Sequence, residues 1–376
     1  MKFTCEQKTL SKALTIVSRA VSTRSTMPIL KGILLTAYPD GRLKLSASDT
    51  DITIQDTIAV NVAEPGSVVV MAKLFSDIVR KLPASEVVIT SSDNGDGETE
   101  NNEVNISSMN SEFHIVGMSA EEFPVISSIN EETESINIDK KTVRSMIEKT
   151  AFAASADEAR GIITGVLVEL SAGSINMVAI DGYRMAINRR TSPDIGTHEF
   201  VISAKILLEL ARIISEVEND EDNGVLYLDK RKATFRFGNI RVELKLMNGK
   251  FIAYQNILPK NARITAVVNR EQLQESIERA SLLTTAGKNN LIRMNVRDTV
   301  MTISSFSEEG KVEEEVITTK QGEDLMIGFN AHYLLDVLKS VEDEEVKILF
   351  NSPVDPCLIV PMEGDEYEYL VLPVRI

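Results

Sequence analysis

Apolar and polar positions along the chain change from an alternating pattern to a helical spacing, and this change recurs three times. Residues 1–20, 135–154 and 264–283 each begin with alternating apolar residues, as a β-strand does. Each continues with apolar residues four positions apart, such as Leu10 and Leu14, which lie on one face of a helix. The pattern therefore predicts a strand followed by an amphipathic helix at three places about 130 residues apart.

A second helix is predicted in each third of the chain. Residues 72–82, 204–214 and 331–341 share the same order of apolar positions, and each carries an acid at the equivalent polar position. Strand-like runs lie between and after the helices; in residues 241–247 apolar and charged residues alternate, which marks a half-buried strand. Few helices among many strands predict an α+β fold with antiparallel sheets, built from one domain repeated three times. The repeat limits predict domains over residues 1–131, 132–262 and 263–376.

The net charge becomes informative once its distribution is counted. The chain has 40 Lys and Arg against 56 Asp and Glu, and this net charge of -16 argues against attraction of a nucleic acid over the whole surface. The six helical stretches nevertheless sum to +6, which leaves -22 for the remainder. Helices tolerate Lys and Arg well, but that tolerance alone would favour Glu equally. The count favours a shared basic helix face that binds phosphates without reading bases.

The sequence lacks the familiar motifs of catalysis and cofactor binding. It has no GxxxxGK[ST] loop, HExxH, CxxC or GxSxG, and His114, His198 and His332 are far apart. We therefore expect no enzyme, no metal and no cofactor, although the many acids leave a hydrolase or transferase with an unrecognised carboxylate site open. Cys5 and Cys357 lie near opposite ends, no apolar run reaches membrane-spanning length, and the first residues do not form a signal peptide. These features predict a cytoplasmic protein without a membrane segment.

Motifs distributed over the whole chain resemble those of one family, the bacterial sliding clamp, which is the beta subunit of DNA polymerase III. They are RSTMPIL (24–30), SDTDI (48–52), EPG (64–66), AKLFSDIVRKLP (72–83), AIDGYRMA (179–186), NGKFIAYQNILP (248–259), IGFNAHYLLDVL (327–338) and LPVRI (372–376). The resemblance implies a non-catalytic processivity factor made of clamp domains. Two subunits would form a head-to-tail ring of six domains, with helices lining the hole around duplex DNA and sheets outside.

The same resemblance implies a pocket for partner peptides between the second and third domains. Its partners would be the polymerase III catalytic subunit, the clamp loader and other proteins that carry a clamp-binding motif. Most of its residues are apolar, which suits the Leu or Phe anchors of a short peptide, although ordinary core packing is the alternative. The family often has His where Tyr183 stands, which is a tolerable aromatic change. It usually has Pro where Ile252 stands, and this departure leaves the peptide preference open. The pocket residues implied are Ile163, Ile180, Gly182, Tyr183, Arg184, Met185, Ile252, Ile257, Leu370, Leu372, Pro373, Val374 and Arg375.

DNA contacts and the dimer interface are expected elsewhere on the chain. The resemblance supports Arg24, Lys73, Arg160 and Lys205 as DNA-binding residues, and charge reasoning adds Arg80, Lys149 and Arg212. For the dimer, the resemblance implies pairing of the strand around Phe113 and Ile115 with the third-domain region near Leu282 and Leu283. It also implies that third-domain acids, here Glu313 and Glu314, face bases of the first domain. Residues 111–117 lack such bases, so apolar contact and strand pairing should dominate. A peptide-binding scaffold that never meets DNA stays open as a third possibility.

Overall fold

A computed structural model of the 376-residue chain describes residues 1–22, 25–92, 102–129, 134–192, 196–217, 223–284 and 290–376. Tertiary contacts group the chain into two compact units. Unit 1 comprises Met1–Lys141 and Glu209–Leu246, and unit 2 comprises Thr142–Leu208 and Met247–Ile376. Among the described residues, no helix has the length and apolar character needed to cross a bilayer.

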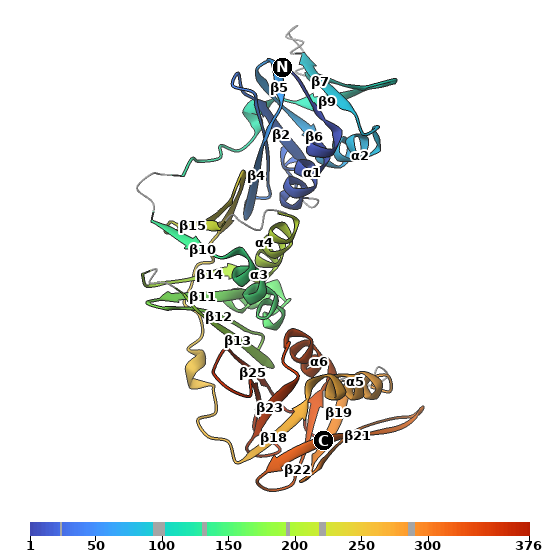
Figure 1. Ribbon diagram of the computed structural model, residues 1–376, viewed down its shortest axis with the longest axis vertical. Coiled ribbons are helices and arrows are strands. Elements are labelled where there is room, and N and C mark those ends of the chain that lie inside the picture. The colour runs from blue at the N-terminus through green and yellow to red at the C-terminus, as the bar shows by residue number, and fades with distance from the viewer. Residues whose placement is uncertain (23–24, 93–101, 130–133, 193–195, 218–222, 285–289) are drawn as a thin grey trace. The chain divides into compact units, whose positions relative to one another are not determined.

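Unit 1 is built on one antiparallel sheet, to which the described residues contribute 13 strands. Helices α1 (Gln7–Val17) and α2 (Ala72–Lys81) pack against each other, α1 on β3 and β4 and α2 on β2 and β6 (Figure 1). The order of the strands is β10 (Ser135–Ile138), β15 (Gly224–Leu228), β16 (Lys232–Phe237), β17 (Ile240–Lys245), β4 (Ile52–Ala59), β3 (Arg42–Ser48), β2 (Gly32–Ala37), β6 (Gly66–Met71), β9 (Ser111–Met118), β8 (Asn102–Ser108), β7 (Glu86–Ser92), β1 (Lys2–Glu6) and β5 (Asn61–Glu64).

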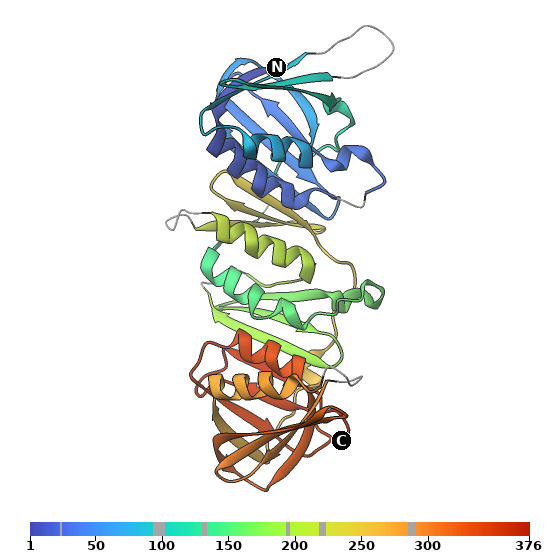
Figure 2. The same cartoon turned by 90° about the vertical axis from the view of Figure 1, so that its right-hand side faces the viewer.

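Unit 2 has the same design, with 12 described strands in its sheet. Helices α5 (Arg270–Ser281) and α6 (Ala331–Ser340) lie side by side on the strands of the third repeat, as Figure 2 shows. The order of the strands is β14 (His198–Ser203), β11 (Gly165–Ser171), β12 (Ser174–Ile180), β13 (Arg184–Thr191), β25 (Tyr367–Val371), β24 (Cys357–Val360), β23 (Glu345–Phe350), β18 (Ile264–Asn269), β21 (Gly310–Gln321), β20 (Val300–Ser307), β19 (Leu291–Val296) and β22 (Leu325–Asn330).

The predicted fold class is confirmed. Each of the six expected helices is present, the remaining two being α3 (Lys140–Glu148) and α4 (Ala204–Glu216), and every paired strand among the described residues is antiparallel to its neighbour. The spacing that predicted the helices is the spacing of their buried faces; Leu10 and Leu14 are at most 1% exposed. The domain limits at 131/132 and 262/263 stay a prediction, and the first lies outside the described residues.

Neighbouring repeats are joined edge to edge by antiparallel strand pairing, and this explains why the contacts follow sheets instead of repeats. In unit 1, β4 of the first repeat pairs with β17 of the second, with Ile52 opposite Leu244. In unit 2, β13 of the second repeat pairs with β25 of the third, with Arg184 opposite Val371. Each pairing continues one sheet from one repeat into the next, so its backbone groups are satisfied and no free edge remains there.

The turns that precede β4 and β13 have the same construction. The Oδ1 atom of Asp181 accepts hydrogen bonds from the backbone N–H groups of Tyr183 and Arg184, at 2.8 and 2.9 Å. In the β3–β4 turn, Asp49 accepts in the same way from the two corresponding N–H groups, at 3.0 and 2.8 Å. The residue after the aspartate has a positive φ in both turns, 89° at Gly182 and 80° at Thr50. Glycine adopts this conformation freely, whereas a β-branched residue is strained there.

This difference predicts opposite effects of exchanging the two residues. Thr50→Gly should raise the free energy of unfolding by about 1 kcal/mol, because the relieved strain exceeds the extra entropy of the unfolded chain. Gly182→Thr should lower it by at least about 1 kcal/mol, because it creates the same strain and a Cβ would also lie 3.0 Å from Arg160 Nη2. Calorimetric unfolding of both variants checks this pair; equal signs would contradict the account of the turn.

Candidate functional site

The predicted pocket residues of unit 2 gather where the β12–β13 turn meets the end of the chain. Beyond the last pair of β13 and β25, Leu372 N donates to Tyr183 O at 2.8 Å. Two residues later Val374 N donates to Gly328 O in β22, also at 2.8 Å. Backbone hydrogen bonds therefore hold the C-terminal residues against the turn and against β22.

Four of the predicted pocket residues are core residues. Ile163, Ile180, Met185 and Leu370 are at most 8% exposed and belong to one apolar cluster. Packing alone explains why these positions are apolar, so the core-packing alternative holds for them in this structure. They form the base on which the more exposed members rest.

The other apolar members expose an unusual amount of surface. Tyr183, Ile252 and Ile257 are 56%, 40% and 38% exposed, and the partly buried Leu258 and Leu372 pack against the same core cluster. Ile252, which stands where the resembled family usually has proline, is thus a surface residue beside the site. An apolar surface continuous with a core, at a chain end, suits the anchors of a short peptide.

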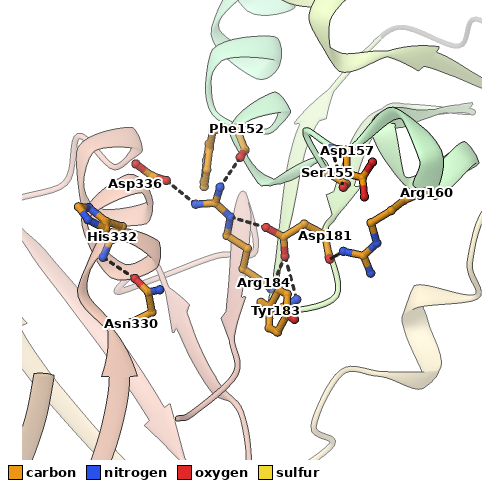
Figure 3. Close-up of polar contacts among 10 residues, drawn as sticks. All are labelled: Phe152, Ser155, Asp157, Arg160, Asp181, Tyr183, Arg184, Asn330, His332 and Asp336. Carbon is orange, nitrogen blue, oxygen red and sulfur yellow. Dashed lines mark hydrogen bonds and ion pairs between the residues drawn. The ribbon is translucent and has the colours of Figure 1, made fainter. Parts of the chain in front are cut away.

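Arg184 is the central polar residue of this region (Figure 3). Its side chain is 11% exposed and its Nε lies 3.0 Å from Asp181 Oδ2. Its Nη1 pairs with Asp336 on α6, and its Nη2 donates to the main-chain oxygen of Phe152 at 2.8 Å. Removing either acid would leave a largely buried charge less compensated, so the network fixes the turn against α6.

Aromatic rings surround the guanidinium group of Arg184. It lies over the rings of Phe152 and Tyr333, 5.4 and 4.8 Å from their centroids. The ring of Tyr183 stacks on that of Tyr333, with 6.0 Å between centroids and 18° between planes. Burial raises the pKa of the Tyr333 hydroxyl, and the nearby Asp181 carboxylate adds to this shift. The two stacked rings form a flat apolar shelf. The guanidinium of Arg184 contacts the ring of Tyr333 and thereby helps to position this shelf.

Sequence reasoning did not select Tyr333, Phe152 or Asp181 for this site. Asp336 was recognised only as the repeated acid of the second helix. Tyr333 lies in the quoted IGFNAHYLLDVL motif, but a lone tyrosine in a helix indicates no particular role. Of the three, Asp181 was the easiest to predict from the sequence, because an aspartate followed by glycine between two strand-like runs is a turn signal.

Arg160 lies beside the pocket. Its Nη1 donates to the main-chain oxygen of Asp181 in the β12–β13 turn (Figure 3). A Cβ at Gly182 would lie 3.0 Å from its Nη2. An exposed guanidinium at this place could meet either a phosphate or the carboxylate of a peptide. Its role in DNA binding stays a prediction.

The remaining predicted DNA-binding residues differ in how far their charge is compensated. Arg24 lies outside the described residues. Lys73 and Lys205 occupy the second position of α2 and α4, are exposed, and form no ion pair with any described residue. In contrast, Arg80 pairs with Asp77, Arg212 with Glu209, and Lys149 with Glu342. The basic helix character counted from the sequence is therefore partly neutralised by neighbouring acids, and Lys73 and Lys205 keep the most available charge.

Strand β9 carries the predicted first-domain side of the dimer interface. It pairs with β8 along its length but with β6 only at Gly117 and Met118. Among the described residues, the other edge of 111–116 thus has no partner strand. Phe113 is 38% exposed there, Ile115 is half-buried and Val116 is exposed. Exposed apolar residues along an open edge are typical of a strand that pairs with another chain.

Strand β21 provides a second open edge. It pairs with β20 over residues 310–317, whereas its pairing with β18 is confined to residues 318–321. Within the described part of the chain, 310–317 therefore has one free side. Leu283 lies beside this strand, because a Cβ on Gly310 would be 3.9 Å from its Cδ1, and Leu282 is exposed.

The two acids expected to face bases of the first domain have partners in their own repeat. Glu314 accepts from Arg279 Nη2 at 2.8 Å, and Glu313 lies 2.7 Å from Lys311 Nζ. Each of these cations lowers the pKa of its carboxyl partner. The acids therefore need no partner from a second subunit.

No group of three or more potential metal ligands occurs among the described residues. Burial raises the pKa of Asp56 to about 6; this carboxyl lies in unit 1 and lines a cavity beside α1 and β4.

A three-domain chain with antiparallel sheets, paired helices and an apolar site beside its C-terminus defines the DNA clamp class of fold. Family models for the N-terminal, central and C-terminal domains of the DNA polymerase III beta subunit match residues 1–127, 137–252 and 255–375.

Similarity to known clamps extends over the full chain. Beta sliding clamps of Staphylococcus aureus and Bacillus subtilis are each 31% identical to it, over the whole chain and 99% and 100% of the relative. The crystal structure of the Bacillus subtilis clamp matches with a TM-score of 0.94 at 31% identity, covering 100% of this chain and 99% of that one. A Pseudomonas aeruginosa clamp bound to griselimycin matches over both full chains with a TM-score of 0.91 at 27% identity. The chain belongs to the bacterial sliding-clamp family, the beta subunit of DNA polymerase III.

Proposed function

We propose that two copies of the chain close into a head-to-tail ring that encircles duplex DNA and tethers DNA polymerase III to it, without catalysing a reaction. The observation that carries this proposal is the pair of open edges, β9 in the first repeat and β21 in the third. The two junctions within the chain are closed by edge pairing. A third junction of the same kind, formed between two chains, would close a ring.

The internal junctions predict the register of this third junction. In unit 2, Tyr369 lies opposite Ala186, and in unit 1, Val242 lies opposite Ile54. The hairpins β3–β4, β12–β13 and β20–β21 can be aligned through the residue pairs that face each other across their two strands. In this alignment Ala186 of β13 corresponds to Val312 of β21. Strands β25 and β9 can be aligned in the same way, because β25 pairs with β24 and β9 pairs with β8. In this alignment Tyr369 of β25 corresponds to Phe113 of β9. Phe113 of one copy therefore lies opposite Val312 of the other in the proposed ring.

This register places the apolar residues Phe113 and Val312 on one face and charged residues on the other. Phe113 takes the place of residues that are fully buried at both internal junctions. On the opposite face of the strands, Glu112 lies opposite Glu313 of the second copy. Like charges directly across a strand pair destabilise it, so strand pairing and apolar contact carry the interface.

A charge reversal at this position should therefore strengthen the dimer. Glu112→Lys places a cation opposite Glu313, and each ring contains the contact twice. The dimer should become about tenfold tighter, since each changed cross-strand pair contributes up to about 1 kcal/mol. Sedimentation or mass photometry across a dilution series gives the dissociation constant.

A matched variant separates this contact from net charge. Glu121→Lys makes the same charge change on an exposed residue of the same repeat and should leave the dimer constant unchanged. A weaker dimer for Glu112→Lys would show that the register is wrong, and a stable wild-type monomer at micromolar concentration would count against the ring.

The charge distribution suits a ring that surrounds DNA without holding it tightly. A chain of net charge -16 repels the phosphate backbone at long range, whereas Lys73 and Lys205 offer uncompensated cations at equivalent helix positions. A few phosphate contacts give weak, salt-dependent binding that does not read sequence, and this permits sliding. The proposed place of action is the cytoplasm, where a bacterium replicates its DNA.

The apolar surface around Tyr183 is the proposed docking site for partner proteins. The polymerase III catalytic subunit, the clamp loader and other proteins would each insert a short peptide with apolar anchors there. Binding by the ring keeps a partner at high effective concentration near the template, because dissociation from DNA requires the ring to open. Arg160 and Arg375 would give the site an exposed basic rim.

Removal of residues 372–376 tests this site, because it removes Leu372 and the backbone bridge from Val374 to Gly328. Affinity for a fluorescent clamp-binding peptide from the polymerase subunit should fall at least about thirtyfold, the effect of losing about 2 kcal/mol of anchoring contacts. Tyr183→Ala, which leaves the backbone intact, should weaken binding in the same direction.

The dissociation constant of the dimer should be the same for both variants as for the wild type, since neither β9 nor β21 is altered. Val354→Ala, at a 74% exposed residue of the same unit, serves as the control for peptide binding. Unchanged peptide affinity in the truncated protein would refute the assignment of the site.

A further inference from the structure

A cavity of about 350 Å³ lies within unit 1, between α1, β4, the end of α4 and the β16–β17 turn. Its apolar wall includes Ala13, Ile16, Ile58, Phe237 and Ile240. A cavity of this size exceeds the small voids of a packed core and can hold a small ring.

Two carboxyl groups line this cavity. Asp56 is 6% exposed; it accepts a backbone hydrogen bond from Thr57 and is attracted by the cation of Lys12, which also lines the cavity. Glu216 accepts from Arg19 Nη2 through Oε1 at 2.5 Å, but its Oε2 is buried and has no hydrogen-bond partner among the described residues. Burial without a partner is costly for such an acceptor, so the Glu216 carboxylate is suited to a ligand that donates a hydrogen bond.

The corresponding place in unit 2 can be identified from strand pairing. Ile240 lies opposite Asp56 at the junction of β17 with β4, and Tyr367 lies opposite Asn188 at the junction of β25 with β13. Asp56 and Asn188 occupy the same position in their hairpins. Helix α4 begins at Ala204 and helix α6 at Ala331. Glu216 and Asp343 lie the same number of residues after these alanines, so they also correspond.

Phenol groups fill this place in unit 2. The hydroxyl of Tyr367 donates to Asp343 Oδ2 at 2.5 Å, and that of Tyr369 donates to Lys149 O at 3.1 Å. In unit 1 the two tyrosines are replaced by Ile240 and Val242, which are shorter and lack a donor. The acid that would accept from the phenol is still present as Glu216. The cavity is therefore the space of a missing phenol, with its hydrogen-bond acceptor retained.

We propose that this cavity binds a phenol whose hydroxyl donates to Glu216, as Tyr367 donates to Asp343 in unit 2. The apolar wall accommodates the ring, and the Glu216 carboxylate accepts a hydrogen bond from the hydroxyl. An aliphatic or purely aromatic hydrocarbon offers the Glu216 carboxylate no hydrogen bond. The phenol is either a free small molecule or the side chain of a tyrosine in a partner protein.

The test uses the full-length protein with labelled isoleucine methyl groups and p-cresol, the side-chain analogue of tyrosine, observed by NMR. Titration should shift the signals of Ile16, Ile58 and Ile240, which line the cavity, and leave that of Ile303, buried in unit 2, unchanged. Toluene has the same ring without the hydroxyl and should bind at least tenfold more weakly, the effect of about 1.4 kcal/mol. Absence of shifts at these methyls up to millimolar p-cresol, or equal binding of toluene, would overturn the proposal.

A variant that supplies the phenol gives an independent measurement. Ile240→Tyr places at this position the residue that unit 2 has, so it should abolish p-cresol binding and raise the thermal midpoint. Val354→Ala should change neither property. Undiminished p-cresol binding by Ile240→Tyr would place the ligand elsewhere and overturn the proposal.

The two sources of the phenol are separated with a blocked Gly-Tyr-Gly peptide. If the peptide shifts the same methyl signals as p-cresol, the cavity admits a tyrosine side chain from a partner. If only p-cresol shifts them, the proposal holds for a free small molecule.

Discussion

Antiparallel pairing between the edges of successive repeats is the constraint on which the rest of the structure depends. One repeat leaves an open strand at each side, and backbone N–H and C=O groups along such an edge require partners. The chain satisfies two of these edges internally, through β4 with β17 and β13 with β25. Among the described residues it leaves one side of residues 111–116 in β9 and of residues 310–317 in β21 without a partner strand, as expected of a building block for a closed ring. The proposed oligomer therefore follows from the same physical requirement as the fold of the single chain.

The same junction carries different chemistry in each unit, because only the side chains around its turn have changed. In unit 2, Leu372 N donates to the main-chain oxygen of Tyr183, and the exposed side chains there are apolar. In unit 1, Lys245 N donates to the oxygen of Asp51 in the same way, but the two side chains form an ion pair at 2.9 Å. An ion pair in place of an apolar surface removes the anchor for a hydrophobic peptide. This explains how three similar repeats provide one proposed docking site per chain.

Local periodicity was sufficient to predict the six helices and the threefold repeat, because side chains four apart define a helix face wherever the helix packs. Some of the ion pairs could also be predicted from the sequence, because their residues lie at helical spacing, as in Arg80 with Asp77 and Arg212 with Glu209. The pairing of Lys149 with Glu342 was not accessible, because these residues are distant in sequence. For the same reason the junctions, the contact of Arg184 with Asp336 and the shelf of Tyr183 on Tyr333 could not be predicted. The apolar character of a residue also did not predict its burial, since Ile180 is buried and Ile257 is exposed.

The central claim is topological: the ring stays on DNA because it surrounds it, and its contacts with phosphate are weak. The most direct measurement loads the labelled protein with a clamp loader onto nicked circular plasmid, then compares retention before and after the plasmid is cut once. The account predicts stable retention on the circle and rapid loss from the linear product, where the ring slides off the ends. Equal retention on both would contradict encirclement, and no retention on either, with peptide binding intact, would favour a scaffold that never meets DNA.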